Sequence, residues 1–330
     1  NGGGAYASGL TNCTLEANFA SNSGGGAYTA AAATNTVFRG NTAVTSGGGV
    51  YQGFLVDCQI VSNRVTSTGG DGGGFYGSAA GHRLLGCLVL GNETPDLGGG
   101  VYNAALSNCV VRGNRATGAS ATTGSGGGVY ATAVTYPASR CYILDNEANY
   151  RGGGAYQGAF YSCVFSGNSA SEGAGAYLYS TTYLLNSCTV AGNFTTNKYG
   201  GVYNGTIKNS IIYGNTARVY NNYTNTTSSA ITYTCAYPLP PGTGNTAAEP
   251  QLTGYRDPHL LPGSPLIGAG LAEAWMAVAA DIDGDERAPG GVTDIGADQH
   301  NPSGLTGPLS VAIVPETNVC VMGVALGLRA

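Results

Sequence analysis

A tyrosine preceded by glycines and one apolar residue recurs along the first two thirds of this chain, and this repeat constrains the fold more than any other feature. In the segment Gly47–Tyr51 the tyrosine follows three glycines and a valine. Cys58 comes seven residues later, and Asn63 comes five residues after that. The tyrosine column consists of Tyr6, Tyr28, Tyr51, Tyr76, Tyr102, Tyr130, Tyr156, Tyr177 and Tyr203.

Two further columns run in phase with the tyrosines. Small side chains form the first, at Cys13, Thr36, Cys58, Cys87, Cys109, Cys141, Cys163, Cys188 and Ser210. An asparagine stands five residues after each of these positions, at Asn18, Asn41, Asn63, Asn92, Asn114, Asn146, Asn168, Asn193 and Asn215. Units of 21–28 residues therefore fill roughly residues 1–217. A period of this size is the signature of a repeat architecture.

The units have the pattern of short strands rather than of helices. A glycine triplet inside a helix would cost about 1 kcal/mol per residue. In stretches such as Cys13–Glu16 and Cys109–Arg112 the first and third residues are apolar and share one face, as they do in a strand. One or two such strands bury no core alone, so the units must stack. We predict an all-β parallel β-helix, a solenoid of about ten coils spaced about 4.8 Å apart, with an irregular C-terminal cap and a terminal β-strand tail.

Each column has a predicted role in the coil. The small side chains can stack on their own copies in a narrow core, and the residue two positions later is always apolar. Asparagine tolerates a left-handed corner, and its amide can bond to the asparagine of the next coil. The glycines allow positive φ or close approach of two backbones. The apolar residue before each tyrosine is expected to face inward, which places the tyrosines outward as a stacked stripe.

Seven of the nine cysteines belong to the column of small side chains. Stacked side chains on parallel strands are close to one another, but their geometry rarely suits a disulfide. We therefore interpret them as buried free thiols. Metal binding is the alternative, although paired CxxC motifs and neighbouring histidines are both missing. Cys235 and Cys320 lie outside the column.

Composition narrows the function classes. Only 9% of residues are charged and 56 of 330 are glycine, while hydrophobic residues still make up 42%. This balance fits a solenoid with small polar turns better than a disordered chain. The net charge of −5 and the lack of a basic run argue against nucleic acid as a partner. No stretch approaches the length of about twenty apolar residues that a membrane span needs.

The repeat pattern divides the chain into three parts. Residues 1–217 hold the repeats, residues 218–300 are expected to cap the open end of the β-helix, and residues 301–330 are expected to form a linker and a β-strand tail. Pro238, Pro240 and Pro241 break the regular pattern near the start of the cap. Because the chain begins at Asn1 inside a repeat, without a signal peptide or initiating Met, we expect a processed or excised piece of a longer precursor.

The repeats resemble those of a known group of bacterial proteins. The pattern Gly-Gly-(Ala/Val)-Tyr with Asn-Cys-x-Val-x-x-Asn over residues 1–217 is similar to polymorphic outer-membrane-protein-type β-helix repeats, found in bacterial surface proteins and adhesins. Residues 218–300 resemble the choice-of-anchor type Q domain, on the segments Gly242–Asn245, Glu249–Pro250, Ser264–Pro265, Asp281–Gly284, Arg287 and Asp294–Ala297. Where family members often carry Glu, this chain has Gln299. The resemblance implies a right-handed β-helix, export and an extracellular or bacterial cell-surface location, and it transfers no catalytic residues.

Pectate-lyase-like enzymes share the β-helix, so the fold alone does not decide the function. A hydrolase needs two or three carboxylates on one face. The acids of the repeats occupy different repeat positions and are expected to be scattered and solvated, at Glu16, Asp57, Asp71, Glu93, Asp96, Asp145, Glu147 and Glu172. His82, His259 and His300 sit in unrelated contexts and are expected to be surface or loop residues. We therefore predict no catalytic residues, with a polysaccharide lyase or glycoside hydrolase as the alternative.

One set of acids is a candidate metal site. Asp281, Asp283 and Asp285 alternate along the chain and offer oxygens to a Ca²⁺ ion. The spacing is not that of an EF-hand, because Gly284 is at the wrong place and no Glu stands at position twelve. The alternative is that Asp and Gly shape turns in the cap and that an Asp pairs with Arg287. No other cofactor is expected.

The tyrosine column is the one feature that invites a ligand, since exposed aromatic rings stack on sugar faces. Stacking on neighbouring tyrosines is the favoured role. We expect a non-enzymatic, secreted bacterial protein with a structural or adhesive role, with surface glycans as a candidate partner; the alternative is a polysaccharide-binding or polysaccharide-cleaving module. The apolar residues from Leu309 to Leu328 are β-prone and could complete the sheet of a second copy, giving head-to-tail fibres. Truncation of a longer chain is the alternative explanation of the two open ends.

Overall fold

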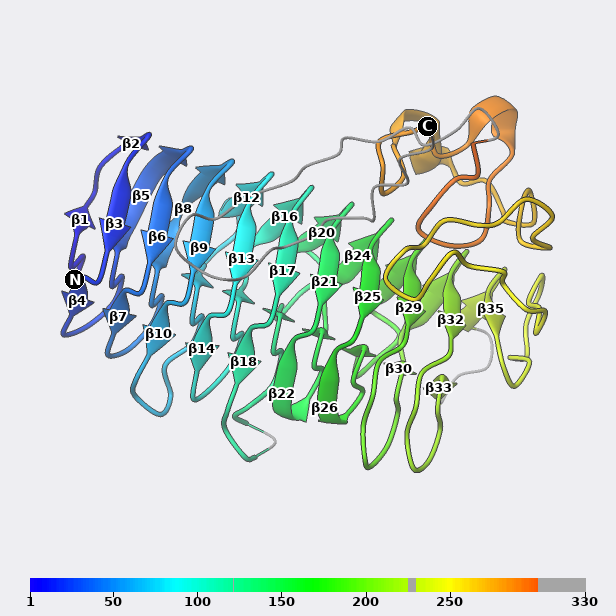
Figure 1. Cartoon of the computed structure of the whole chain (residues 1–330), viewed down its shortest axis with the longest axis horizontal. Helices are drawn as coiled ribbons and strands as arrows, with labels where there is room; N and C mark the ends of the chain where they lie inside the picture. The colour runs from blue at the N-terminus through cyan, green and yellow to red at the C-terminus, as the bar shows by residue number, and fades with distance from the viewer. Residues whose placement is uncertain (121, 225–229, 302–330) are drawn as a thin grey trace, which may run out of the picture.

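The computed structural model describes residues 1–120, 122–224 and 230–301. Within these ranges the chain forms a parallel β-helix whose short strands stack from coil to coil along one long axis (Figure 1). One sheet contains ten strands, so the predicted solenoid of about ten coils is confirmed. The described ranges contain no α-helix. Two short 3-10 segments, η2 (Ala274–Val278) and η3 (Pro289–Gly291), lie near the C-terminal end.

The strands form three sheets. An eighteen-stranded sheet carries the tyrosine column: β1 (Ala5–Tyr6), β2 (Leu10–Thr11), β5 (Ala27–Thr34), β8 (Val50–Val56), β11 (Phe75–Tyr76), β12 (Arg83–Leu85), β15 (Val101–Tyr102), β16 (Ala105–Ser107), β19 (Val129–Tyr130), β20 (Pro137–Ser139), β23 (Ala155–Tyr156), β24 (Ala159–Tyr161), β27 (Ala176–Tyr177), β28 (Leu184–Asn186), β30 (Val202–Tyr203), β31 (Thr206–Lys208), β33 (Tyr223–Thr224) and β34 (Ile231–Thr232). A ten-stranded sheet begins beside the cysteine column: β3 (Thr14–Glu16), β6 (Val37–Arg39), β9 (Gln59–Val61), β13 (Leu88–Leu90), β17 (Val110–Arg112), β21 (Tyr142–Leu144), β25 (Val164–Ser166), β29 (Thr189–Ala191), β32 (Ile211–Tyr213) and β35 (Cys235–Ala236). A seven-stranded sheet follows the asparagines: β4 (Phe19–Ala20), β7 (Thr42–Ala43), β10 (Arg64–Val65), β14 (Glu93–Thr94), β18 (Arg115–Ala116), β22 (Glu147–Arg151) and β26 (Ser169–Glu172).

The repeat columns set the register of these sheets. Pairing between neighbouring coils is parallel, and it places Tyr6 beside Tyr28 and Phe38 beside Ile60. The apolar residues that the pattern assigns to the interior are buried, with Phe75 and Ile60 both fully inaccessible. Burying one such side chain stabilises a fold by roughly 1.5–3 kcal/mol. Stacked coils therefore supply the core that one unit lacks.

The residue immediately before each asparagine of the column has a positive φ angle and forms a left-handed corner. Positive φ angles occur at Ala17 (52°), Ser62 (54°) and Asp145 (54°), and at a glycine such as Gly113 (65°) in other coils. No asparagine of the column has a positive φ. The prediction that asparagine itself takes the left-handed conformation is therefore wrong. Its side chain turns inward instead, where the amide bonds to neighbouring coils.

The glycine triplets serve both of the uses expected of them. Gly47, the first of its triplet, has a φ of 65°. A Cβ atom on Gly48, the second, would lie 2.3 Å from the carbonyl oxygen of Gly73 in the next coil. Such a distance is too short for a side chain, so the sequence needs glycine there.

Residues 218–300 form two different structures. β33, β34 and β35 complete a tenth coil, and Thr246 extends the pairing beyond Cys235. The chain that follows, which was expected to close the open end, packs instead along the flank of the ten-stranded sheet (Figure 1). There Ile282 and Ala297 form a small buried cluster with Val164 of β25. We call residues 250–300 the flank segment.

Polar contacts attach the flank segment to the coils. Lys208 Nζ lies 2.7 Å from Glu273 Oε1, and the backbone N–H of Ala297 donates to Thr189 Oγ1 at 3.0 Å.

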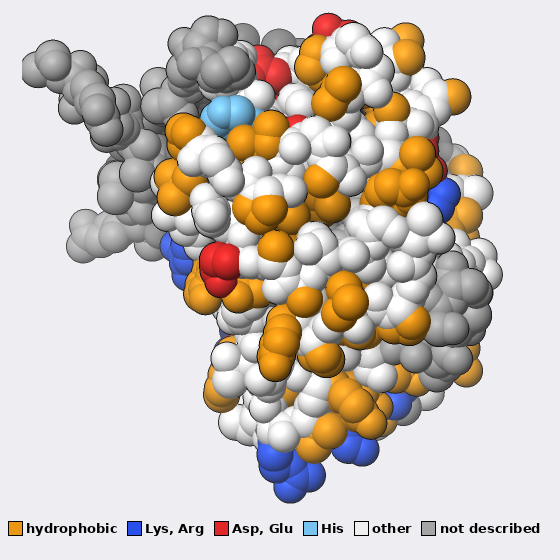
Figure 2. Space-filling model, turned by 90° about the vertical axis from the view of Figure 1, so that its right-hand side faces the viewer, with side chains coloured by type: hydrophobic (Ala, Val, Ile, Leu, Met, Phe, Trp, Pro, Cys, Tyr) orange, Lys and Arg blue, Asp and Glu red, His pale blue; other side chains and the backbone are white. Residues whose placement is uncertain are grey.

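Viewed from the end of the stack at which β35 lies, hydrophobic side chains on the surface are interspersed with polar ones (Figure 2). None of the helical segments in the described ranges has the length and hydropathy to span a bilayer. The predicted tail strand lies outside the described residues.

Candidate functional site

The tyrosine column forms one continuous stack. The centroids of neighbouring rings, from Tyr6 to Tyr203, lie 4.4–5.6 Å apart, and the angles between ring planes are 3–22°. The column faces outward, because the residue before each tyrosine points into the core. The exposed fraction is 62% at Tyr6, 8% at Tyr156 and 4% at Tyr177, and Tyr203 at the far end is again half-buried. Arg151 covers part of it, with its guanidinium carbon 4.6 Å from the centroid of the Tyr177 ring.

This geometry limits how the rings can bind a sugar. Carbon atoms in contact lie about 3.5–4 Å apart. A sugar placed between two aromatic rings would contact both faces, so the two rings would have to lie roughly twice this contact distance apart. The neighbouring tyrosines already cover each other's faces at 4.4–5.6 Å. Only ring edges and hydroxyl groups remain along the interior of the column.

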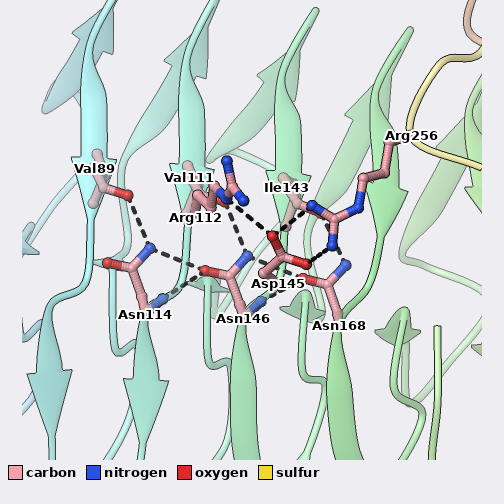
Figure 3. Close-up of polar contacts among 9 residues, drawn as sticks. All are labelled: Val89, Val111, Arg112, Asn114, Ile143, Asp145, Asn146, Asn168 and Arg256. Carbon is pink, nitrogen blue, oxygen red and sulfur yellow. Dashed lines mark hydrogen bonds and ion pairs between the residues drawn. The ribbon is translucent and has the colours of Figure 1, made fainter. Parts of the chain in front are cut away.

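The asparagine column forms a buried ladder of hydrogen bonds (Figure 3). The Nδ2 group of Asn146 donates to Asn168 Oδ1 at 3.0 Å and to the carbonyl oxygen of Val111 at 2.9 Å. Its Oδ1 accepts from the backbone N and from Nδ2 of Asn114, at 3.0 and 2.9 Å. Asn114, Asn146 and Asn168 are fully buried. The same pattern repeats along the column and ties each coil to the coils on both sides.

The cysteine column is a line of thiols inside the core. The eight cysteines within the described ranges are free, and Cys13 is the one of them that is partly exposed. Cys58 Sγ donates to the carbonyl oxygen of Val56 at 3.2 Å. A hydrogen bond with Cys87 and burial raise the pKa of Cys58 well above its ordinary value. A thiol held neutral in this way is a poor nucleophile and a poor metal ligand.

Some acids of the repeats are aligned, contrary to the expectation that they are scattered. Glu93 and Glu147 both follow an asparagine of the column, and Arg115 lies between them in the seven-stranded sheet. Arg115 Nη1 is 3.6 Å from Glu93 Oε2, and its Nε is 3.1 Å from Glu147 Oε2. Arg64 lies on the other side of Glu93, with its Nε 3.4 Å from Glu93 Oε1. These acids therefore form cross-strand ion pairs with arginines.

Asp71 and Asp96 are a second pair of repeat acids that lie close together rather than scattered. They come from adjacent coils, and burial together with the charge of Asp96 raises the pKa of Asp71 to about 7. Asp71 Oδ1 accepts from the backbone N of Leu97 at 3.2 Å. Asp96 is 6% exposed, and its Oδ1 has no hydrogen-bond partner among the described residues. Burial and the charge of Asp71 raise the pKa of Tyr102, which places this pair beside the tyrosine column.

The three predicted Ca²⁺ ligands do not converge on one point. Asp281 is fully buried, and its Oδ1 accepts from the backbone N–H groups of Asp283, Gly284 and Asp285 at 2.9–3.0 Å. Its Oδ2 accepts from the backbone of Gln299 at 2.9 Å. Asp281 therefore shapes the loop, as the turn-forming alternative proposed. Asp283 and Asp285 turn toward other groups.

Arg287 does not pair with an aspartate carboxylate. Its Nη2 donates to the carbonyl oxygens of Asp294 and Gly296, both at 2.7 Å, and the residue is fully buried. Its Nε and Nη1 have no hydrogen-bond partner within the described ranges. The expected side-chain pair is therefore replaced by a backbone contact that fixes the segment before Asp298.

The histidines differ more than their sequence contexts indicated. His82 Nδ1 accepts from the backbone N of Gly53 at 3.3 Å, and His300 Nδ1 lies 3.2 Å from the carbonyl oxygen of Leu260. His259 contacts the carboxylates of Asp257 and Asp283. His259 lies in a loop, as expected, but it is half-buried and held by two carboxylates. Its partners lie up to 24 positions away in an irregular region, where no period in the sequence signals the contact.

Comparison of the chain with protein-family models, with curated proteins and with solved structures gave no match. The likeness to outer-membrane-protein-type repeats and to a choice-of-anchor domain therefore rests on the residues named above. The function has to be argued from the geometry of this chain.

Proposed function

We propose that this chain is a non-catalytic structural β-helix, a rigid rod that acts outside the cell or on its surface. The tyrosine column carries the proposal, because ring faces that could bind a ligand are covered by neighbouring tyrosines at 4.4–5.6 Å. Aromatic pairs of this kind stabilise by about 0.5–1.5 kcal/mol each. The location outside the cell is part of the proposal and rests on the resemblance of the repeats.

The other repeat columns support the same role. The buried amides of Asn114, Asn146 and Asn168 bond only to the coils above and below them. Arg115 pairs with Glu93 and Glu147 from adjacent strands. Each of these contacts joins coils, so the repeated residues are used for holding the rod together.

A second candidate is a polysaccharide-cleaving module, and the pair Asp71 and Asp96 is the observation that favours it. A raised carboxyl pKa beside a second carboxylate is the arrangement that glycosidases use for acid and base. Against it, Asp96 is only 6% exposed, so a substrate would reach Asp71 alone without a rearrangement.

Incubation with a panel of polysaccharides separates the two candidates. The chain and its Asp71→Asn variant are mixed with neutral, acidic and amino polysaccharides, and released sugar ends are measured by chromatography. The structural proposal predicts no product from either protein. Turnover by the wild-type chain that Asp71→Asn abolishes would overturn it. Turnover that survives in the variant would place the chemistry elsewhere and would also contradict a non-catalytic rod.

Head-to-tail assembly through the C-terminal segment is a further part of the proposal. It follows from the β-prone sequence between Leu309 and Leu328, which lies outside the described residues. Electron microscopy of the full chain and of a variant lacking residues 303–330 tests it. Fibres from the full chain alone support strand donation, whereas fibres from both, or from neither, contradict it.

A further inference from the structure

Three loops of the flank segment bring chemically similar groups together. The first loop carries Asp257 and His259, the second carries Asp283, and the third carries Asp298. Asp281 fixes the second loop by accepting three backbone N–H groups. These loops lie on the outer face of the ten-stranded sheet, where Ile282 and Ala297 pack against Val164.

One imidazole nitrogen and two carboxylates meet at this point. His259 Nε2 lies 2.5 Å from Asp283 Oδ2. A ligand atom from each of His259, Asp283 and Asp298 lies within 4.8 Å of the other two. In the described part of the chain this is the one group of three or more His, Cys, Asp or Glu side chains with such spacing. A metal with ligand bonds of about 2.0–2.2 Å would draw these atoms together by a small movement of side chains.

Asp257 orients the imidazole from the opposite side. Its Oδ1 contacts His259 Nδ1 and also accepts from the backbone N of His259 at 3.3 Å. With Nδ1–H donating to a carboxylate, Nε2 is the nitrogen left to face Asp283 and Asp298. Metal-binding histidines in proteins almost always have such a carboxylate or carbonyl partner on the other nitrogen.

Asp298 is the most buried member of the group. The residue is 4% exposed, and the structure gives its carboxylate no hydrogen bond or ion pair with the rest of the described chain. It lines a pocket of about 220 Å³ together with His259, Asp283 and His300. A buried carboxylate without a partner is costly, and it is commonly stabilised by a bound cation. The pocket leaves room for water in any further coordination position.

The local charge also favours a cation. Four carboxylates, those of Asp257, Asp283, Asp285 and Asp298, line the pocket beside His259.

We propose that His259 Nε2, Asp283 and Asp298 bind a divalent first-row metal ion, with Asp257 as a positioning residue. Zn²⁺ fits best, since imidazole nitrogen and carboxylate oxygen are its usual ligands alongside thiolate. Ca²⁺ prefers an all-oxygen site and six to eight ligands. The ion would join three loops that the sequence places up to 41 residues apart, and would thereby fasten the flank segment on the rod.

Calorimetric titration of EDTA-treated, dialysed full-length protein with ZnCl₂ tests the proposal, with MnCl₂ and CaCl₂ in parallel. We expect one Zn²⁺ per chain, a higher thermal unfolding midpoint with Zn²⁺, and weaker binding of Ca²⁺. The absence of saturable binding by Zn²⁺ and Mn²⁺ would overturn the site and would leave His259 as a protonated partner of the two aspartates. Tighter binding of Ca²⁺ than of Zn²⁺ would also contradict it.

Variants locate the ion. His259→Ala and Asp298→Asn are expected to lose at least about 100-fold in Zn²⁺ affinity, and Asp257→Asn about 10–100-fold, as for other residues that orient a ligand. His82→Ala is the matched control, because His82 contacts a coil backbone and lies outside the flank segment. Unchanged affinity in His259→Ala, or equal loss in His82→Ala, would refute the assignment. Circular dichroism of each variant shows that it is folded.

The free thiols need a separate control, because cysteine also binds Zn²⁺. Co²⁺ replaces Zn²⁺ as a probe, since a thiolate ligand adds a strong charge-transfer absorption band and a nitrogen–oxygen site does not. The proposal predicts Co²⁺ d–d bands without that charge-transfer band, and their loss in His259→Ala. A thiolate band that persists in His259→Ala would place the metal on cysteine and contradict the proposal.

Discussion

Replacing Asn146 by alanine should be among the most damaging changes in the rod. The amide of Asn146 takes part in four hydrogen bonds, two through Nδ2 and two through Oδ1. Alanine removes all four and leaves the backbone N–H of Asn114 and the carbonyl oxygen of Val111 without these partners. Both residues are fully buried, so water cannot replace the lost bonds.

The magnitude follows from the groups that lose partners. A buried donor or acceptor left unsatisfied costs about 1–3 kcal/mol. Asn168 Oδ1 keeps a second bond, from the backbone N of Asn146, and so adds little. The carbonyl oxygen of Val111 keeps its bond in the parallel ladder between β17 and β21. One unsatisfied buried N–H, one carbonyl oxygen that loses its second bond and one weakened amide give a loss of about 2–4 kcal/mol in the free energy of unfolding.

Asn18→Ala is the matched control in the same column. Asn18 is partly exposed in the first coil, and its Nδ2 donates one bond, to Asn41 Oδ1 at 2.9 Å. Asn41 Oδ1 still accepts from the backbone N of Asn18 after the substitution. The expected loss is therefore about 0.5–1.5 kcal/mol.

Urea unfolding followed by circular dichroism measures both variants, and hydrogen exchange locates the damage. Asn146→Ala should be about 1 kcal/mol or more less stable than Asn18→Ala, with faster exchange at the backbone amide of Asn114. Equal destabilisation by the two substitutions would refute the argument that the ladder derives its strength from buried, doubly bonded amides.

Two further predictions concern groups inside the coils. Thiol titration under denaturing, non-reducing conditions should count at least seven free groups, since the column cysteines are free. Among the cysteines that the structure describes, native protein should react mainly at the partly exposed Cys13. A denatured count near one would mean disulfide pairing. Asp71 should make stability fall as pH rises, because its pKa is about 7 in the folded state against 3.8 in an unperturbed chain, so the folded state holds the extra proton between these values. Three pKa units correspond to about 4 kcal/mol, which partial exposure reduces to about 2 kcal/mol between pH 4 and pH 8. Asp71→Asn should lose this dependence, and an unchanged slope in urea titrations across that range would contradict the assignment.

The sequence predicted the coils well because their determinants are local and repeated. Phe75 and Tyr76 occupy opposite faces of one strand, and each stacked copy repeats the same choice. The left-handed corner was assigned one residue too late because both Asn and its predecessor suit a turn. The inward hydrogen bonds that decide between them join different coils and leave no local signal.

The contacts of the flank segment could not be predicted in this way. His259 and Asp298 are 39 positions apart, and neither belongs to a column. Asp71 and Asp96 stand at different distances from their glycines, and the loops of adjacent coils bring them together. In both cases the three-dimensional path of an irregular segment decides the contact, and periodicity carries no information about it.

The most direct test of the central claim is the free energy of unfolding of Tyr130→Ala compared with that of Tyr6→Ala. The Tyr130 ring is stacked on both faces, 5.3 Å from Tyr102 and 4.8 Å from Tyr156. Tyr6 is stacked on one face and is 62% exposed. If the column holds the rod together, Tyr130→Ala should lose at least about 2 kcal/mol and Tyr6→Ala less than about 1 kcal/mol. A Tyr130→Ala protein as stable as the wild-type chain would contradict the structural role of the column.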